Sequence, residues 1–210
     1  MYCPALFRED RLEVQHALIR SNPLGLLISH GSTGLVANLL PFVLKTGDSE
    51  RGVLQAHIAR ANPQWRELDD QAVLVVFRGP DAYVSPSLYA TKKETGKVVP
   101  TWNYAMVQAR GKSRLRDSTD WLSPQLSSLT NGREATRLQP WSVSDAPAAY
   151  VEAQKKAIVG IEIEIAVLEG KWKVSQNQPE VNRRSVAAGF SLEDSTHQMA
   201  ELVRSYGKLE

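Results

Sequence analysis

The first segment whose residue types could bind a ligand is His57–Trp65, which reads HIARANPQW. A strand is predicted to end there, and a polar turn leads into the start of a short helix. Backbone N–H groups and the helix dipole favour phosphate at such a point. Arg60 adds a guanidinium that suits phosphate oxygens, and Asn62 could cap the helix or reach a ligand. The segment predicts either a phosphate site or a capped turn with a surface arginine.

A second candidate is the segment Val98–Lys112, which reads VVPTWNYAMVQARGK. Its proline favours an extended backbone at the preceding residue, and a strand follows. Strand alternation places Trp102 and Tyr104 on one face, and Asn103 joins small side chains on the other. An aromatic, amide-bearing corner of this kind is either a packed turn or the wall of a pocket for a flat ligand.

Basic residues continue along the same face of this strand: Arg110, Lys112, Arg114 and Arg116. Like charges in such a row repel one another unless a bound anion neutralises them. Such charges also discourage edge-to-edge pairing of sheets. We interpret Arg114 and Arg116 as a solvated edge. Arg110 and Lys112 lie close enough to the aromatic corner to serve an anionic ligand.

Two further segments could line a binding site. The stretch Gly170–Gln178, GKWKVSQNQ, alternates Lys173 and Ser175 with Trp172 and its neighbours. It either ends a sheet or donates hydrogen bonds to an anionic or heteroaromatic ligand. The stretch Gly79–Tyr89, GPDAYVSPSLY, is predicted to be a stiff loop that contains a short extended piece, either a hairpin connection or the edge of a cleft.

Motifs for catalysis or metal binding are missing from the sequence. The histidines are scattered and Cys3 is the single cysteine, so no metal site is predicted. No nucleophile elbow, P-loop or dinucleotide-binding glycine motif occurs. Glu162 and Glu164 share a strand face, which favours a solvated face over an acid–base pair. No catalytic residue is assigned.

Composition narrows the class of protein. The 210 residues suit one domain, or one domain with a small appendage. The net charge of +2 gives no whole-chain field that would draw the protein onto nucleic acid or an anionic membrane. A single cysteine fits a reducing cytoplasm, and no apolar run is long enough to span a membrane.

The predicted elements that would position these residues are strands and helices without a βαβ repeat. Periodicity and turn residues predict strands over 24–29, 34–44, 52–58, 72–78, 98–116 and 158–168. They predict helices over 7–20, 59–68, 118–130, 147–157 and 179–207. The sequence therefore favours a mainly β fold with helices (α+β), built as a small antiparallel barrel.

Taken together, the segments resemble the PaiB-type family of FMN-binding negative transcriptional regulators. The matching pieces follow the order of the family and cover most of residues 1–177. They read MYCPALFRE, NPLGLL, HIARANPQWREL, VVFRGPDAYVSPSLY, TGKVVPTWNYAMVQARGK and KAIVGIEIEIAVLEGKWKVSQN. The most specific are HIARANPQW and PTWNYAMVQARG, since neither is a generic fold pattern.

The resemblance implies an FMN-binding split β-barrel, antiparallel and similar to pyridoxamine-phosphate-oxidase-like flavoproteins, with C-terminal helices. It implies a homodimer with FMN between the subunits, with residues 35–40 beside the isoalloxazine ring and residues 57–62 near the phosphate. The cofactor-binding positions that follow from it and from the patterns above are His57, Arg60, Asn62, Trp102, Asn103, Tyr104, Arg110, Lys173, Ser175 and Gln176.

Two positions depart from the family pattern. Leu39 stands where a histidine is expected, and Leu88 stands where a tryptophan is expected. We interpret both as edges of the pocket. Their exchange for leucine could leave a weak, altered or empty flavin site without changing the fold.

The predicted organisation is a split-barrel domain over 1–177, with a helical insert at about 118–157, and a helical tail over 178–210. The predicted function is that of an FMN-binding homodimeric regulator in the cytoplasm. The alternative is a flavin-dependent oxidoreductase on the same fold. Such an enzyme needs no dedicated acid or base residue, because the bound flavin supplies the redox chemistry. Direct DNA binding has little support, since the helical segment 183–204 carries Glu193, Asp194 and Glu201.

Overall fold

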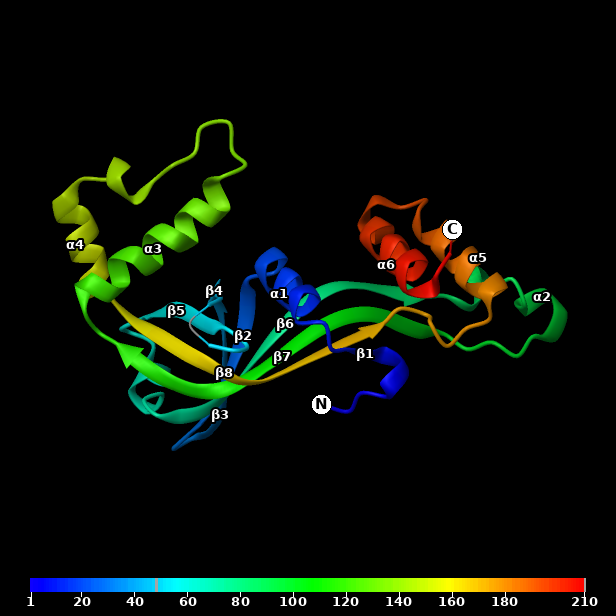
Figure 1. Cartoon of the computed structure of the whole chain (residues 1–210), viewed down its shortest axis with the longest axis horizontal. Coiled ribbons are helices and arrows are strands. Elements are labelled where there is room, and N and C mark those ends of the chain that lie inside the picture. Colours follow the sequence, from blue (N-terminus) through cyan, green and yellow to red (C-terminus); the bar gives the residue numbers. More distant parts are fainter. Residues whose placement is uncertain (48, 210) are drawn as a thin grey trace. The chain divides into compact units, whose positions relative to one another are not determined.

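The computed structural model describes residues 1–47 and 49–209 (Figure 1). The strands are β1 (Arg8–Glu9), β2 (Leu24–Gly31), β3 (Gly34–Pro41), β4 (Val43–Lys45), β5 (Val53–Ala59), β6 (Gln71–Val84), β7 (Thr101–Arg116) and β8 (Ile158–Lys173). The α-helices are α1 (Leu12–Ser21), α2 (Lys92–Thr95), α3 (Thr119–Glu134), α4 (Ala148–Lys156), α5 (Glu180–Phe190) and α6 (His197–Gly207).

The chain divides into two compact units. Unit 1 comprises residues 1–18, 78–107 and 169–210, and unit 2 comprises residues 19–77 and 108–168. The long strands β6, β7 and β8 each contribute residues to both. The predicted domain boundary at residue 177 falls inside unit 1 and stays a prediction.

The strands of the described residues form an antiparallel sheet in the order β3-β2-β6-β7-β8-β5-β4, and β1 pairs with β8. The predicted hairpin is confirmed, because β2 and β3 pair antiparallel with Leu26 opposite Leu39. Proline has no N–H to donate, so β3 ends at Pro41, and the next residue, Phe42, donates its N–H to Pro23 O at 2.8 Å. The predicted mainly β, antiparallel fold with helices is confirmed.

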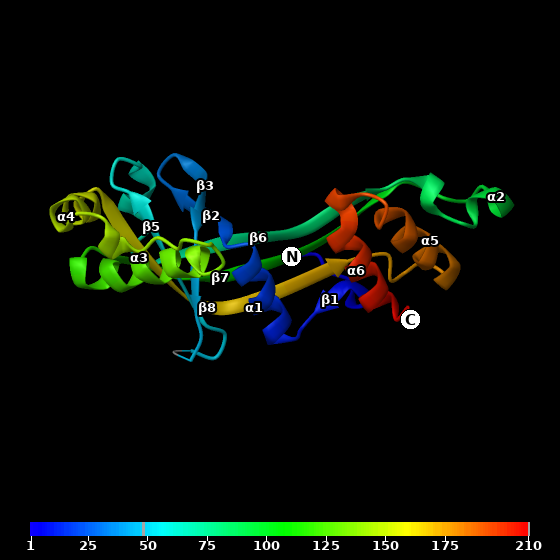
Figure 2. The same ribbon diagram turned by 90° about the horizontal axis from the view of Figure 1, so that it is seen from above.

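Unit 2 has a core that follows directly from strand alternation. On β8, Ile161, Ile163 and Ile165 turn inward and are at most 3% exposed, whereas Glu164 between them is exposed. Helices α3 and α4 run beside one another in this unit (Figure 2). Leu122 of α3 is buried. The predicted helical insert is therefore a packed part of unit 2.

Unit 1 has a second core, in which α5 and α6 pack side by side (Figure 1). The apolar residues of these helices recur at helical spacing, so that each helix has one buried stripe. They pack with the end of β6 and the segment after β8, in a cluster of Ala82, Val84, Tyr89, Val174, Val186, Ala187, Phe190, Met199, Ala200 and Val203. The C-terminal helices thus complete a core.

Several predicted elements are wrong in their bounds. Of the helix predicted over 59–68, Ala59 ends β5 and only Pro63–Glu67 is helical, as a 3-10 turn. The helix predicted from residue 7 begins only at Leu12, because Arg8 and Glu9 pair with β8 as a short strand. The loop predicted over Gly79–Tyr89 is a strand as far as Val84, where β6 ends. Local glycine and proline signals predicted a break there, but tertiary pairing and burial extended the strand.

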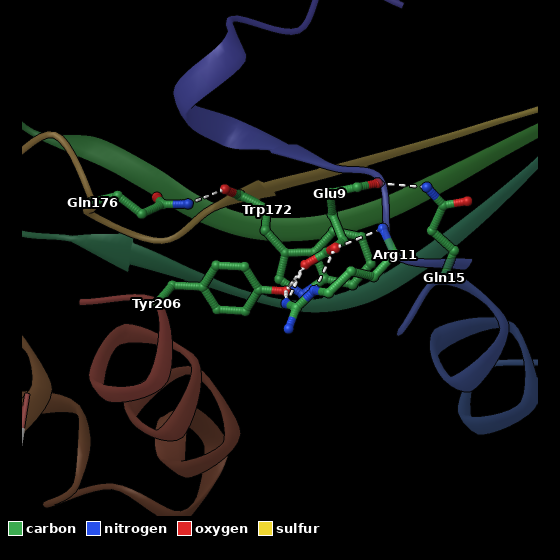
Figure 3. Close-up of polar contacts among 6 residues, drawn as sticks. All are labelled: Glu9, Arg11, Gln15, Trp172, Gln176 and Tyr206. Carbon is green, nitrogen blue, oxygen red and sulfur yellow. Dashed lines mark hydrogen bonds and ion pairs between the residues drawn. The ribbon is translucent and has the colours of Figure 1, made fainter. Parts of the chain in front are cut away.

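A polar network joins the two ends of the chain within unit 1 (Figure 3). The Glu9 carboxylate, which is buried, accepts hydrogen bonds from Arg11 Nε at 2.8 Å and from the Tyr206 hydroxyl. The Tyr206 ring stacks on Trp172 with centroids 6.3 Å apart. Burial and the Glu9 carboxylate both raise the pKa of Tyr206, so the phenol remains protonated and donates. Glu9 therefore anchors α6 to the N-terminal segment.

Candidate functional site

The segment predicted to be either a phosphate site or a capped turn folds as a capped turn, and its arginine makes four hydrogen bonds to described residues of the protein. Arg60 donates from Nη1 to Asp117 Oδ2 at 3.1 Å and from Nη2 to Asp117 Oδ1. Its Nε and Nη2 also donate to the carbonyls of Lys156 and Ile158, both at 3.0 Å. The guanidinium therefore fastens the turn to the ends of the helical insert, and Asp117 neutralises its charge.

The other two residues predicted in this segment also bind the protein itself. Asn62 caps the turn over residues 63–67, since its Oδ1 accepts from Gln64 N at 3.1 Å. The predicted cap is confirmed. His57 Nδ1 lies 3.0 Å from Oε1 of Gln125, a buried residue of α3. Gln125 Nε2 has no hydrogen-bond partner in the described part of the chain.

In the basic row on β7, Lys112, Arg114 and Arg116 pair with carboxylates in unit 2. Arg110 Nη2 donates to Gln108 Oε1 at 3.3 Å. Further along, Lys112 and Arg114 pair with Asp70 at 3.5 and 3.4 Å, and Arg116 pairs with Glu162 at 2.7 Å. These last three basic residues line a hollow of about 730 Å³, together with Val53, Gln55, Glu162, Glu164 and Ala166.

The interpretation of Glu162 as part of a solvated face holds only in part, because its side chain is 21% exposed. Burial raises the pKa of Glu162, but hydrogen bonds from Arg116, Gln55 and Trp121 lower it by more, so the carboxylate stays ionised. Gln55 Nε2 donates to Oε2 at 2.8 Å, and Trp121 Nε1 donates to the same oxygen at 3.2 Å. Glu162 thus joins β5, β7 and α3 through its hydrogen bonds in unit 2. Glu164 is exposed, as predicted.

The aromatic corner lies in unit 1 and brings several predicted residues together. Trp102 is 54% exposed and meets Tyr83 edge to face with ring centroids 5.7 Å apart. On the opposite strand face Asn103 is buried, and its Nδ2 donates to Ser175 Oγ at 2.9 Å. Tyr104 is half-buried, with the Lys171 ammonium 5.4 Å from its ring centroid.

Lys173 connects the corner to the segment after β8. Its Nζ donates to Thr101 Oγ1 at 2.5 Å and to Trp102 O at 2.6 Å. Burial lowers the pKa of Lys173, and the neighbouring Lys171 charge lowers it further. Lys173, Asn103 and Ser175 line one cavity of about 320 Å³ in unit 1.

Gln176 closes the turn that shapes this cavity. Its Nε2 donates to Trp172 O at 2.6 Å, and its Oε1 accepts from Val174 N at 2.7 Å (Figure 3 shows the first). Between them Ser175 has a φ of 67°, a left-handed conformation that non-glycine residues rarely adopt. The side chain of Gln176 therefore holds Ser175 in a strained backbone position beside the cavity.

The strain at Ser175 gives a testable expectation. Ser175→Gly and Ser175→Ala both remove the hydroxyl that meets Asn103, but only alanine keeps a Cβ in the left-handed region. We expect Ser175→Gly to be more stable than Ser175→Ala by about 1 kcal/mol. Urea unfolding of the two variants measures the difference, and equal midpoints would show that this backbone position is unstrained.

The predicted site residues thus fall into two groups. Unit 2 holds His57, Arg60, Asn62 and Arg110; unit 1 holds Trp102, Asn103, Tyr104, Lys173, Ser175 and Gln176. Sequence reasoning missed Thr101, Lys97 and Asn182 in the cavity lining. Asn182 is buried and heads the apolar stripe of α5, and a polar residue at that helical spacing was the available signal.

The two leucines that depart from the expected pattern have different settings. Leu39 is 59% exposed on β3. Leu88 is partly buried and packs against the core of unit 1, where a Cβ at Gly189 would approach its Cδ2 to 2.5 Å. Leu88 packs against α5 and does not line the cavity of unit 1, and its interpretation as the edge of a flavin pocket stays a prediction.

The described residues contain no membrane-spanning helix and no cluster of metal ligands. None of the helices over 1–47 and 49–209 is long and apolar enough to cross a membrane. Within the same ranges, no group of three or more His, Cys, Asp or Glu side chains gathers in a way that could hold a metal ion.

Comparison with known proteins adds family information to this geometry. A family model described as "Putative FMN-binding domain" matches residues 1–167. An uncharacterized protein of Emericella nidulans is 38% identical, covering 100% of this chain and 99% of the relative. The Bacillus subtilis "Protease synthase and sporulation protein PAI 2" is 30% identical, covering 97% of this chain and 96% of the relative.

Solved structures share the fold at low identity. The flavocytochrome Anf3 of Azotobacter vinelandii is 16% identical with a TM-score of 0.57, covering 79% of this chain and 69% of that one. A Mycobacterium smegmatis FAD and haem binding protein is 17% identical with a TM-score of 0.56, covering 86% and 78%. The likeness shows the fold alone, and the predicted split β-barrel fold is confirmed.

Proposed function

The chain belongs to the family described as "Putative FMN-binding domain", and we propose that it binds FMN as a homodimer and acts as a negative regulator of transcription. Flavin binding has the direct support of the family match over residues 1–167. The regulatory part is supported by the resemblance to PAI 2, whose name refers to protease synthesis and sporulation.

The side chains of unit 1 fit the chemistry of FMN, which presents a flat heteroaromatic ring, a hydroxylated chain and a phosphate. Trp102 and Tyr83 offer exposed aromatic surface, and the buried Asn103 and Ser175 offer amide and hydroxyl groups. Lys173 adds a positive charge within the same cavity lining. This gathering of aromatic, neutral polar and cationic groups in one unit is the observation that carries the proposal.

The residues of unit 2 fit the phosphate less well, because Arg60, Asn62 and His57 bind other parts of the protein. We therefore propose that Asn103, Ser175 and Lys173 hold the polar parts of the cofactor. Trp102 lies on the other face of β7, so we propose that it covers the ring of the cofactor held by the second copy of the dimer. When bound, FMN supplies one- and two-electron redox chemistry that protein side chains lack. The residues of this chain bind and orient it.

The homodimer has independent support from exposed apolar side chains on β3. Leu35 is 77% exposed and Leu39 is 59% exposed, and both alternate outward on this strand. Apolar side chains grouped on an outward strand face are typical of surfaces that a partner or ligand covers. A second copy of the chain is the occupant that we propose.

Purified protein incubated with FMN is expected to acquire the visible absorption of flavin and to elute at about twice the 23.3 kDa mass of one chain. Trp102→Ala should weaken FMN binding by up to about tenfold, the size of one aromatic contact. Trp141→Ala is the matched control, because Trp141 is similarly exposed at 48% against 54%. Colourless protein whose melting temperature is unchanged by millimolar FMN would refute flavin binding.

Two assays separate the regulatory role from an enzymatic one. Retardation of promoter DNA that weakens steeply with salt would indicate direct DNA contact. The segment that joins α5 to α6 exposes Glu193 and Asp194, and α6 exposes Glu201, so we expect no such contact from this helix pair. Oxidation of reduced nicotinamide by the flavin-loaded protein would instead place it among the flavin-dependent oxidoreductases.

A further inference from the structure

We infer that the 320 Å³ cavity of unit 1 binds the phosphate group of a small ligand, with Lys173 as its central cation. Where that phosphate is the one on FMN, this site rests on the proposed function and deepens it. Where it belongs to a separate phosphorylated ligand, the site stands apart from flavin binding. The chemistry of recognition is the same in both cases.

The charge of the cavity wall favours an anion. Lys97 and Lys173 both line it, and its described lining contains no aspartate or glutamate. The remaining polar groups are neutral hydrogen-bonding side chains, including Thr101, Asn103, Ser175 and Asn182. A cavity with cations and neutral donors but no carboxylate repels cationic ligands and stabilises phosphate oxygens.

Lys173 has the geometry of an anion-binding group. Its two acceptors, Thr101 Oγ1 and Trp102 O, are both neutral. An ammonium has three N–H donors, so one remains for a ligand. Among the ion pairs of the described residues, none joins Lys173 to a carboxylate. The pKa of Lys173 is lowered by partial burial and by the neighbouring Lys171 charge, which agrees with a half-buried ammonium that pairs with no carboxylate in the described part of the chain.

The rest of the wall is held in place before any ligand arrives. Asn182 Oδ1 accepts from Thr91 N at 3.1 Å, and Asn103 is fixed by Ser175. Ser175 sits in its left-handed conformation because Gln176 closes the turn around it. Backbone strain of this kind persists where surrounding structure enforces it, and it concentrates at binding sites.

Arg60 and Lys173 differ in whether a carboxylate pairs with them. Both residues are cations in segments predicted to serve an anionic cofactor, but Arg60 makes an ion pair with Asp117 and binds two carbonyls. A phosphate at Arg60 would have to displace a carboxylate of the protein. A phosphate at Lys173 would meet an ammonium that forms no ion pair with a carboxylate of the described residues.

The test compares three probes on the full chain: FMN, riboflavin and inorganic phosphate. Riboflavin lacks the phosphate, so the ratio of FMN to riboflavin affinity measures recognition of that group. Lys173→Gln should weaken binding of the phosphate-bearing probe by about 10-fold to 100-fold, as expected for a charge-assisted hydrogen bond. Lys97→Gln, an exposed change that leaves the core intact, should weaken it less. Lys92→Gln on α2 is the control, since Lys92 is exposed and lies outside the described lining.

Flavin fluorescence titration and melting temperature in phosphate, at matched ionic strength in chloride, give the two readouts. Weaker FMN binding by Lys173→Gln with riboflavin unchanged supports the site, with FMN as the source of the phosphate. Phosphate stabilisation that Lys173→Gln abolishes, with flavin binding equal or absent in all variants, supports a separate phosphorylated ligand. If the wild type is stabilised by phosphate through Lys173 but takes up no flavin, the proposed flavin binding is refuted and the phosphate site remains supported. Equal binding of FMN and of phosphate by wild type, Lys173→Gln and Lys97→Gln overturns the inference.

Discussion

Replacing Gly111 by alanine is expected to lower the free energy of unfolding by at least about 3 kcal/mol, beyond the usual cost of overpacking. Gly111 lies on β7 where it passes β8 inside unit 2. A Cβ built there would lie 2.0 Å from Glu164 O and 2.9 Å from Ile163 Cγ2. The first contact is with backbone, so no side-chain rotation relieves it, and the two strands would have to separate.

The matched control is Gly132→Ala on α3, also in unit 2. No atom lies within 4 Å of a Cβ built at Gly132. Alanine favours a helix more than glycine does, so this variant should be as stable as the wild type or more stable by up to about 1 kcal/mol. Urea unfolding of both variants measures the contrast. A Gly111→Ala protein with the wild-type midpoint would contradict the close approach of β7 and β8.

Replacing Glu9 by glutamine is expected to destabilise the protein by about 2–3 kcal/mol at neutral pH, since hydrogen bonds to a charged group are lost. The Glu9 carboxylate accepts from Arg11 N and Nε and from the Tyr206 hydroxyl. Arg11 is 59% exposed, so solvent screens the Coulomb part and most of the effect comes from the hydrogen bonds. Loss of the anchor should loosen α6 first.

The same substitution should change the pH dependence of stability. Burial raises the pKa of Glu9, but hydrogen bonds from Arg11 and Tyr206 lower it by more, to below its ordinary value of 4.5. A carboxyl whose pKa is lowered by folding stabilises the protein above its unfolded pKa, and this contribution is lost as the pH falls through the folded pKa. Wild type and Glu9→Gln should therefore differ most at neutral pH and converge in acid.

Tyr206→Phe provides the companion measurement. It keeps the ring that stacks on Trp172 and removes only the hydroxyl that donates to Glu9. Its destabilisation should be smaller than that of Glu9→Gln, because the hydrogen bonds from Arg11 remain. A Glu9→Gln protein whose stability changes with pH as steeply as that of the wild type would show that Glu9 is not the group responsible.

Strand alternation made much of the fold predictable. The pattern of Ile161, Ile163 and Ile165 against Glu162 and Glu164 needs only the two-residue period of a strand. The hairpin of β2 and β3 followed from two apolar runs around a glycine-bearing turn. The extension of β6 through Gly79 and Pro80 was not predictable, because the local signals for a break were overruled by pairing and burial.

The candidate site was predictable in its residue types but not in their partners. Asn103, Lys173 and Ser175 were chosen from two segments about 70 positions apart, and the fold brings them to one cavity. Arg60 had the chemistry of a phosphate ligand, yet Asp117, 57 positions away, takes its charge. Glu162 looked like a solvated carboxylate, but Arg116, Gln55 and Trp121 surround it.

By itself the sequence determined the antiparallel, mainly β class and the alternating faces of β7 and β8, and it offered the cap at Asn62 as one of two alternatives. These features depend on neighbours a few positions apart, which local sterics and hydrogen bonding fix. Only the tertiary structure decided which charges are free to meet a ligand. A charged side chain is neutralised by an oppositely charged group within about 4 Å of it. Asp117 pairs with Arg60 in this way, whereas no ion pair of the described residues joins Lys173 to a carboxylate.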